Sequence, residues 1–199
     1  MNALRSNWDS ARVAATLLLT NPGVPFIYYG EEIGMRGAKP DERIRTPMQW
    51  DGSATAGFTT GMPWEELAGE VETVNVATQS ADANSLLNHY RALIRLRAAH
   101  PALRAGDMAL VNSDSRKVYA ALRYGEGETI LIVANLSEDA VSEYALSLSS
   151  GPLAGVASAQ MLLGEGSPAA PKINVTGGFD AYAPLPTLPP KSAVVIALK

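Results

Sequence analysis

The first third of the chain alternates between a helical and an extended pattern of apolar residues. Asp9 or Ser10 can cap a helix, and the helix-forming residues 11–20 become uniformly apolar at 17–19. Asn21-Pro22-Gly23 has turn chemistry, and Val24–Tyr29 is an apolar run about as long as a strand buried on both faces. A helix followed by such a strand is the repeating unit of a parallel α/β sheet or barrel.

A long connection follows, and then a second helix. Residues 36–80 show almost no sustained periodicity but keep several large apolar side chains, which indicates an ordered loop rather than a linker. Asn84 or Ser85 can cap a helix with a clear apolar stripe that runs to about His100, where Pro101 ends it.

Beyond about residue 107 the period changes from helical to alternating. Alternating runs separated by Gly, Pro, Ser and Asp predict strands at 118–124, 129–136, 142–148, 154–163 and 192–198, as in an antiparallel sandwich. The Pro- and Gly-rich segment 164–190 is expected to cross the end of that sandwich. We therefore expect two domains, residues 1–106 and 107–199, with the boundary where RAGD interrupts the pattern.

Composition excludes several function classes. The net charge of −4 and a pI near 5.2 argue against a nucleic-acid partner, and no apolar run is long enough to cross a membrane. Without cysteine there is neither a disulfide framework nor a thiolate zinc site, and we expect no metal site and no cofactor in this chain. Residues 1–10 lack the pattern of a secretory signal, and location in the cell stays unknown.

The chemistry-bearing residues gather just after the predicted strand. Glu31 and Glu32 suggest paired carboxylates, but consecutive side chains of an extended segment point to opposite faces, so a role in fixing the loop is the stronger interpretation. Arg43 and Arg45 would share a face, where they could donate to sugar hydroxyls or pair with nearby carboxylates. Five aromatic residues could form flat apolar walls for a sugar, or could simply belong to the hydrophobic core: Tyr28, Tyr29, Trp50, Phe58 and Trp64. These residues form a site rim without a complete catalytic constellation.

Four segments carry a family resemblance. GVPFIYYGEEIGM resembles the eighth barrel strand and the following loop of the α-amylase superfamily of glycoside hydrolases, GH13. KPDERIRTPMQW, GFTTGMPW and NVATQSADANSLLNHYRALIRLRAAHPAL are similar to the remainder of that barrel, and the sandwich is similar to the β-domain that follows it. The resemblance implies a terminal fragment of a (β/α)8 barrel, α/β, followed by an all-β antiparallel sandwich.

The resemblance also implies a function and its limits. Such enzymes use an Asp nucleophile, a Glu acid/base and a substrate-holding Asp after earlier strands, and no position here matches those motifs, so no catalytic residue is expected in this chain. The implied parent is an α-amylase-like retaining hydrolase of α-glucans; an α-glucosidase or trehalose-synthase-like transglycosylase is the alternative. Substrate-binding residues implied for the cleft of that parent are Tyr29, Glu31, Glu32, Arg45 and Trp50.

Further expectations concern what the chain binds. The ligand is an α-glucan or maltooligosaccharide, and the protein partner is the missing N-terminal part of the barrel. A structural calcium held by that part is left open, as is self-association through the exposed barrel strand. The alternative from a different functional class is that the chain is a non-catalytic carbohydrate-binding or structural module.

Overall fold

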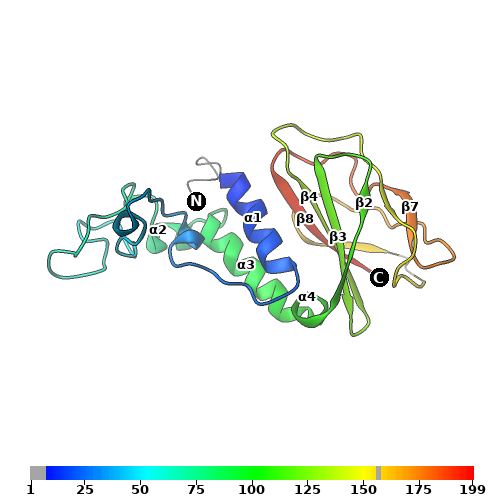
Figure 1. The fold of residues 1–199 in the computed structure, drawn as a ribbon, viewed down its shortest axis with the longest axis horizontal. Helices are drawn as coiled ribbons and strands as arrows, with labels where there is room; N and C mark the ends of the chain where they lie inside the picture. Colours follow the sequence, from blue (N-terminus) through cyan, green and yellow to red (C-terminus); the bar gives the residue numbers. More distant parts are fainter. Residues whose placement is uncertain (1–7, 156–157) are drawn as a thin grey trace. The chain divides into compact units, whose positions relative to one another are not determined.

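A computed structural model describes residues 8–155 and 158–199, which divide into two compact units. The loop unit contains the described residues up to Arg12 together with Pro25–Ala92, and the sheet unit contains Val13–Val24 with Leu93–Lys199. Two helices, α1 (Trp8–Thr20) and α3 (Leu86–Ala99), contribute residues to both units (Figure 1). The domain boundary predicted between residues 106 and 107 stays a prediction.

The sheet unit is a sandwich of two antiparallel sheets. The larger sheet has the order β1-β3-β4-β8-β6, and the smaller has the order β2-β5-β7. The strands and the one short helix that precedes them are α4 (Pro101–Ala105), β1 (Asp107–Leu110), β2 (Asn112–Ser113), β3 (Val118–Gly125), β4 (Glu128–Asn135), β5 (Leu146–Leu148), β6 (Ala159–Leu163), β7 (Phe179–Tyr182) and β8 (Ser192–Leu198) (Figure 1).

Both faces of the larger sheet are buried. Leu122, Leu131 and Ile196 are opposed in register across β3, β4 and β8 and belong to the core shared with the smaller sheet. Residues Ile130 and Ile132 alternate with them and pack with the α4 residues Ala102 and Leu103 on the other face. Because both of its faces are buried, β4 has an almost continuous run of apolar residues rather than a strict alternation of apolar and polar ones.

The predicted antiparallel strands are confirmed for β3, β4 and β8, whereas the others are shorter than expected. Only residues 146–148 of the predicted strand 142–148 pair, and 159–163 is the paired part of the predicted strand 154–163, of which 156–157 lie outside the described residues. Segment 164–190 does more than cross the sandwich, because it contributes β7 to the smaller sheet.

The helices follow the predictions closely. Ser85 caps α3, its hydroxyl accepting a hydrogen bond from the Asn88 amide at 3.1 Å. Pro101 ends α3 as expected but also starts α4, with His100 in extended conformation between them. At the start of α1 the prediction needs correction: Asp9 and Ser10 lie inside the first turn rather than capping it, and Asp9 pairs with Arg12 at 3.1 Å.

The buried strand predicted for Val24–Tyr29 is wrong. This segment pairs with no other strand among the described residues, and its side chains are exposed, with Phe26 at 84 %. An extended apolar run becomes a strand only when a neighbouring strand supplies its hydrogen bonds, and no strand of the described residues pairs with this segment.

The loop unit has a small apolar core and many side-chain to backbone hydrogen bonds. Its two 3₁₀ helices are η2 (Glu31–Ile33) and η3 (Asp41–Ile44), and α2 (Val76–Ala81) is short. The core consists of Ile33, Met48, Val74 and Leu87, with Trp8, Met35 and Val76 packed against it. Loop geometry in this unit therefore depends on buried polar side chains as much as on apolar packing.

In the sheet unit, a buried guanidinium joins α1 to the larger sheet. Arg123 of β3 is 1 % exposed and donates to the carbonyls of Thr20 (2.5 Å), Gly106 (2.8 Å) and Asp107 (3.3 Å). Burial lowers the pKa of Arg123, and the nearby Arg97 lowers it further.

We predict that Arg123→Met lowers the free energy of unfolding by about 3 kcal/mol, because buried carbonyls lose their donor and each such loss costs about 1–3 kcal/mol. Urea unfolding followed by circular dichroism measures the change. Arg116→Met is the matched control, since Arg116 is exposed. Equal stability of the two variants would show that the Arg123 hydrogen bonds contribute nothing net.

Candidate functional site

The candidate site is a pocket of about 330 Å³ in the loop unit, here called the aromatic pocket. Its wall combines four aromatic side chains with one carboxyl group and one guanidinium. The lining residues are Tyr29, Glu32, Arg45, Thr46, Pro47, Met48, Trp50, Phe58 and Trp64. Four of the five predicted substrate-binding residues are therefore brought together, and Glu31 is not among them.

Two glycines set the path of the chain at Glu32. Gly30 (φ 84°) and Gly34 (φ 76°) flank η2 in left-handed conformation, which lets the backbone reverse on both sides of one helical turn. A side chain at Gly30 would also collide with Met35, whose sulfur lies 2.7 Å from the position of a Cβ atom. Short and tightly flanked, η2 directs its consecutive carboxylates toward different neighbours.

Glu31 is engaged by α3. The Tyr90 hydroxyl donates to Glu31 Oε1 at 3.0 Å, and burial together with this carboxylate raises the pKa of Tyr90. Glu31 thus has the loop-fixing role that the sequence favoured for this pair. Its prediction as a sugar ligand stays a prediction.

Glu32 is desolvated and incompletely bonded. Burial raises the pKa of its carboxyl group; the backbone N–H groups of Glu32 and Gly30 oppose the shift, and Glu31 adds to it. Its Oε2 atom is buried and has no hydrogen-bond partner among the described residues. Because Glu32 also lines the aromatic pocket, its carboxyl group is a candidate acceptor for a hydrogen bond from a ligand hydroxyl.

The segment Arg45–Met48 forms one side of the aromatic pocket and is held by Tyr29, whose hydroxyl donates to the Thr46 carbonyl at 3.0 Å. Burial raises the pKa of Tyr29, and the neighbouring Tyr28 adds to this shift. Arg45 pairs with Asp41 at 3.3 Å, but both side chains are largely exposed, so the ion pair contributes little stability and leaves the guanidinium able to bind a ligand.

Trp50 is positioned through its own backbone and through the residue before it. Its carbonyl accepts from the Ala77 amide at 2.9 Å, and its amide donates to the Ala56 carbonyl at 2.8 Å. The preceding Gln49 is fully buried and donates to the Val74 carbonyl. The Trp50 backbone is therefore fixed while half of its side chain, 51 %, stays exposed.

Asp51 organises the turn that leads to Phe58. Its carboxylate accepts from the Ser53 amide at 2.9 Å, and the hydrogen bonds from Ser53 lower the pKa of Asp51. Phe58 and Trp64 (62 % exposed) complete the wall. Both were recognised from sequence as flat apolar candidates, although they were not among the five predicted ligands.

Gln79 fixes η2 from a distance in sequence that no local pattern reveals. Its side-chain amide donates to the Ile33 carbonyl at 2.7 Å and accepts from the Leu87 amide at 3.1 Å, so one side chain joins η2, α2 and α3. Its own carbonyl accepts from Ser85 Oγ. Nothing in the sequence around Gln79 distinguishes it from a surface glutamine, and sequence reasoning missed it.

Neither histidine takes part in the aromatic pocket. His89 contacts the Arg12 carbonyl through its Nε2 atom at 3.2 Å, and burial lowers its pKa. His100 contacts Glu128 at 3.1 Å. Among residues 8–155 and 158–199, no three or more His, Cys, Asp or Glu side chains form a group that could hold a metal ion. In the same residues no helix is long and apolar enough to cross a membrane.

The model of the α-amylase catalytic domain family matches residues 2–106, just over half of the chain. This chain belongs to the α-amylase catalytic domain family. Its resemblance to the GH13 enzymes, predicted from four sequence segments, is thereby confirmed.

Relatives within the α-amylase family include glucosidases and amylases. An oligo-1,6-glucosidase of Heyndrickxia coagulans is 34 % identical over 171 residues, covering 67 % of this chain and 31 % of the relative. Alpha-amylase 3 of Dictyoglomus thermophilum is 38 % identical over 131 residues, covering 65 % and 26 %. The chain thus spans less than a third of the length of these two proteins.

Solved structures of the family are similar over nearly the whole chain. The trehalulose synthase MutB from Pseudomonas mesoacidophila MX-45 has a TM-score of 0.73 at 29 % identity, covering 96 % of this chain and 38 % of that one. An alpha-amylase from H. orenii has the same TM-score at 32 % identity, covering 100 % and 37 %. Both are enzymes of the kind that the sequence resemblance implied.

The stability of this α-amylase-family chain is expected to depend on pH through Glu32. Because burial raises the folded-state pKa of Glu32, the unfolded state loses this proton first as pH rises from about 4.5, and the folded state is destabilised until its own higher pKa has been passed. We predict that Glu32→Gln raises the melting temperature at pH 7 and that this gain disappears below the unfolded-state pKa. Thermal unfolding at several pH values measures it.

The matched control for this prediction is Glu66→Gln, which removes an exposed carboxylate. It is expected to leave the pH dependence of the wild-type chain unchanged. A melting temperature for Glu32→Gln that is lower than wild type at pH 7 would show that the carboxylate is stabilising and the interpretation of its burial is wrong.

Proposed function

We propose that this chain provides a sugar-binding part of an α-amylase-like retaining glycoside hydrolase whose substrates are α-glucans. The observation that carries this proposal is the aromatic pocket, where Trp50, Phe58 and Trp64 offer flat apolar walls beside the Glu32 carboxyl group and the Arg45 guanidinium. Rings that cover the C–H face of a pyranose, with charged groups able to bind its hydroxyls, suit a neutral sugar. The names of the relatives support the same substrate class.

We further propose that the chain alone binds such sugars without hydrolysing them. Retaining hydrolysis needs two carboxyl groups about 5 Å apart on either side of the scissile bond. Among the described residues that line the aromatic pocket, Glu32 is the single carboxyl group, and the adjacent Glu31 is bound to Tyr90 instead. A binding surface without a catalytic pair results.

Two alternatives remain within and outside the enzyme class. An α-glucosidase or a trehalose-synthase-like transglycosylase as the parent activity is favoured by the oligo-1,6-glucosidase relatives and by the trehalulose synthase structure. A non-catalytic carbohydrate-binding or structural module is favoured by the single pocket carboxyl group. The upstream loops of the parent barrel would distinguish an α-glucosidase or transglycosylase from an α-amylase. Activity of the pure chain tests the non-catalytic module.

We predict that the pure chain binds maltotriose and releases no glucose or maltose from it. Trp64→Ala is expected to weaken binding about tenfold, equivalent to ~1.4 kcal/mol, because one stacking wall is removed. Isothermal titration calorimetry measures binding, and chromatography of the sugar after long incubation measures turnover.

Phe26→Ala is the control for this experiment, since Phe26 is an exposed aromatic residue outside the aromatic pocket. It should bind maltotriose as wild type does. Equal weakening by both substitutions would remove the aromatic pocket as the binding site, and turnover that Glu32→Gln abolishes would show that the chain is catalytically competent.

The exposed segment after the Asn21-Pro22-Gly23 turn motivates a proposal about partners. Phe26, Ile27 and Tyr28 are exposed in extended backbone that pairs with no strand of the described residues. We propose that strands of a barrel cover it in the parent protein, and that a second copy of the chain covers it when the chain is alone. The apolar character of both faces of the segment supports this.

In sedimentation velocity experiments, the chain is therefore expected to self-associate as its concentration rises. Phe26→Glu, which places a charge in the apolar segment, should shift it toward the monomer. Val175→Glu is the control because Val175 is a fully exposed apolar residue of the sheet unit. A wild-type chain that stays monomeric at all concentrations contradicts the proposal.

A further inference from the structure

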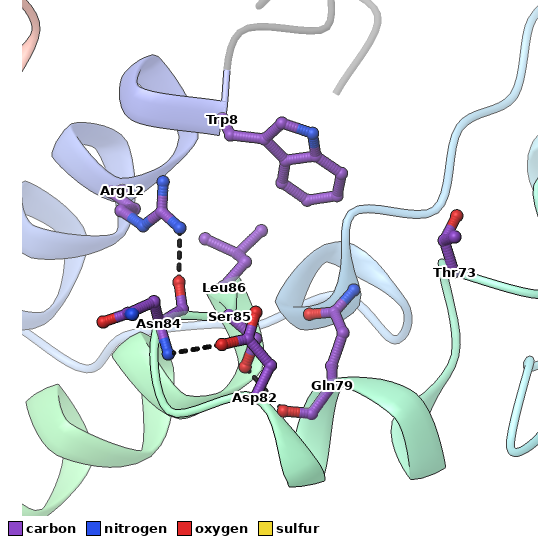
Figure 2. Close-up of a pocket in the computed structure, with 8 residues that line it drawn as sticks. All are labelled: Trp8, Arg12, Thr73, Gln79, Asp82, Asn84, Ser85 and Leu86. Carbon is purple, nitrogen blue, oxygen red and sulfur yellow. Dashed lines mark hydrogen bonds between the residues drawn. The ribbon is translucent and has the colours of Figure 1, made fainter.

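The loop unit contains a second pocket, of about 240 Å³, that shares no lining residue with the aromatic pocket. It lies between the first turns of α1 and the segment 73–86. Its lining residues are Trp8, Arg12, Thr73, Gln79, Asp82, Asn84, Ser85 and Leu86 (Figure 2). We call it the Trp8 pocket.

One wall of the Trp8 pocket is a rigidly held indole. The edge of the Trp8 ring contacts Gly34 so closely that a Cβ atom there would lie 2.4 Å from it, and the Arg36 guanidinium lies 5.9 Å from the ring centroid. The cation–π contact and the close contact with Gly34 hold the ring in this orientation. Leu86 adds a second apolar group below it (Figure 2).

The polar groups of the pocket are arranged opposite the indole. Asp82 Oδ1 accepts from the Asn84 amide at 2.9 Å, whereas Asp82 Oδ2 has no hydrogen-bond or ion-pair partner in the described part of the chain. Thr73 Oγ1 donates to the Glu70 carbonyl at 3.2 Å and keeps its capacity to accept. Arg12 donates to the Asn84 carbonyl at 2.5 Å (Figure 2). It also pairs with Asp9 at 3.1 Å.

Charge and size narrow the class of ligand. Arg12 and Asp82 are the charged residues of the lining and carry opposite charges, so the lining has no net charge that would select an anion or a cation. Its volume is below the ~300–1,000 Å³ of pockets for drug-sized ligands, which limits it to one small ring. A flat apolar wall facing hydroxyl and carboxylate acceptors matches a neutral polyhydroxylated ring.

We propose that the Trp8 pocket is a second sugar-binding site, which takes one pyranose unit of a neutral oligosaccharide. The indole of Trp8 covers the apolar side of the ring, and Asp82 Oδ2 accepts a hydrogen bond from a ring hydroxyl. The inference stands on the pocket's own chemistry and does not depend on the function proposed for the aromatic pocket. A chain with both sites would contact one glucan chain, or two, at separate points.

The three tryptophans make the two pockets separately observable. Trp8 lines the Trp8 pocket, whereas Trp50 and Trp64 line the aromatic pocket. In the ¹⁵N-tryptophan-labelled chain, each indole N–H resonance therefore reports binding at one of the two pockets. Maltotriose is the probe, and Trp50→Phe and Trp64→Phe assign the resonances. We expect the Trp8 resonance to shift saturably as maltotriose is added, with its own midpoint.

Asp82→Ala removes the proposed acceptor and should weaken the Trp8 titration at least fivefold while leaving the Trp50 and Trp64 titrations unchanged. Because this change also removes the acceptor for the Asn84 amide, Asp82→Asn is made as well; it keeps that hydrogen bond and tests the carboxylate alone. Thr73→Trp, which fills the pocket from an exposed position, should abolish the Trp8 titration.

The outcomes separate this inference from the proposed function. A Trp8 resonance that does not move up to the solubility limit of maltotriose overturns the inference, whatever Trp50 and Trp64 do. A moving Trp8 resonance beside stationary Trp50 and Trp64 supports it and refutes binding at the aromatic pocket. A Trp8 shift that Thr73→Trp and both Asp82 variants leave unchanged reflects the surroundings of the indole and also overturns it.

Discussion

The sheet unit depends on two guanidinium groups that surround the C-terminal end of α1. Arg123 donates to the carbonyls of Thr20, Gly106 and Asp107, and Arg97 donates to those of Leu19, Asn21 and Gly23. The last carbonyls of a helix have no partners within it and carry the negative end of its dipole, so cations are the donors that suit them best. With six carbonyls satisfied in this way, a helix, a turn and a strand distant in sequence are joined at one point.

In the loop unit, neutral side-chain amides rather than guanidinium groups donate to backbone carbonyls. Gln49 and Gln79, both buried, bind the carbonyls of Val74 and Ile33, while the Asn75 side chain caps α2 by accepting from the Thr78 amide at 2.7 Å. A segment with so few apolar contacts depends strongly on these hydrogen bonds, because each buried polar group that loses its partner costs about 1–3 kcal/mol. This network positions two residues of the aromatic pocket, because Trp50 directly follows Gln49 and Glu32 directly precedes Ile33.

Sequence patterns predicted those elements whose burial comes from within the chain. The strands β3, β4 and β8 and the helices α1 and α3 carry long apolar patterns that predict them, whereas β2 and β7 are too short to show a period. Val24–Tyr29 has the composition of a buried strand, but burial of a strand is a property of its neighbours, which its own residues do not encode. Turn and loop chemistry brought Glu32, Arg45 and Trp50 together as expected, while the contacts of Gln79 span 46 residues and left no local signal.

Glu31 and Glu32 show how adjacent, identical residues acquire different roles. A carboxylate retained for structure has donors for its oxygens, as Glu31 has in Tyr90, and its burial is thereby compensated. Glu32 is desolvated enough to raise its pKa, keeps one oxygen without a partner among the described residues, and lines the aromatic pocket. Such an arrangement destabilises the folded chain, and perturbed carboxyl groups in pockets concentrate at functional sites. Of the two carboxyl groups, the one that lines the aromatic pocket is therefore the one that the binding proposal needs, and the one bonded to Tyr90 supports the loop that carries it.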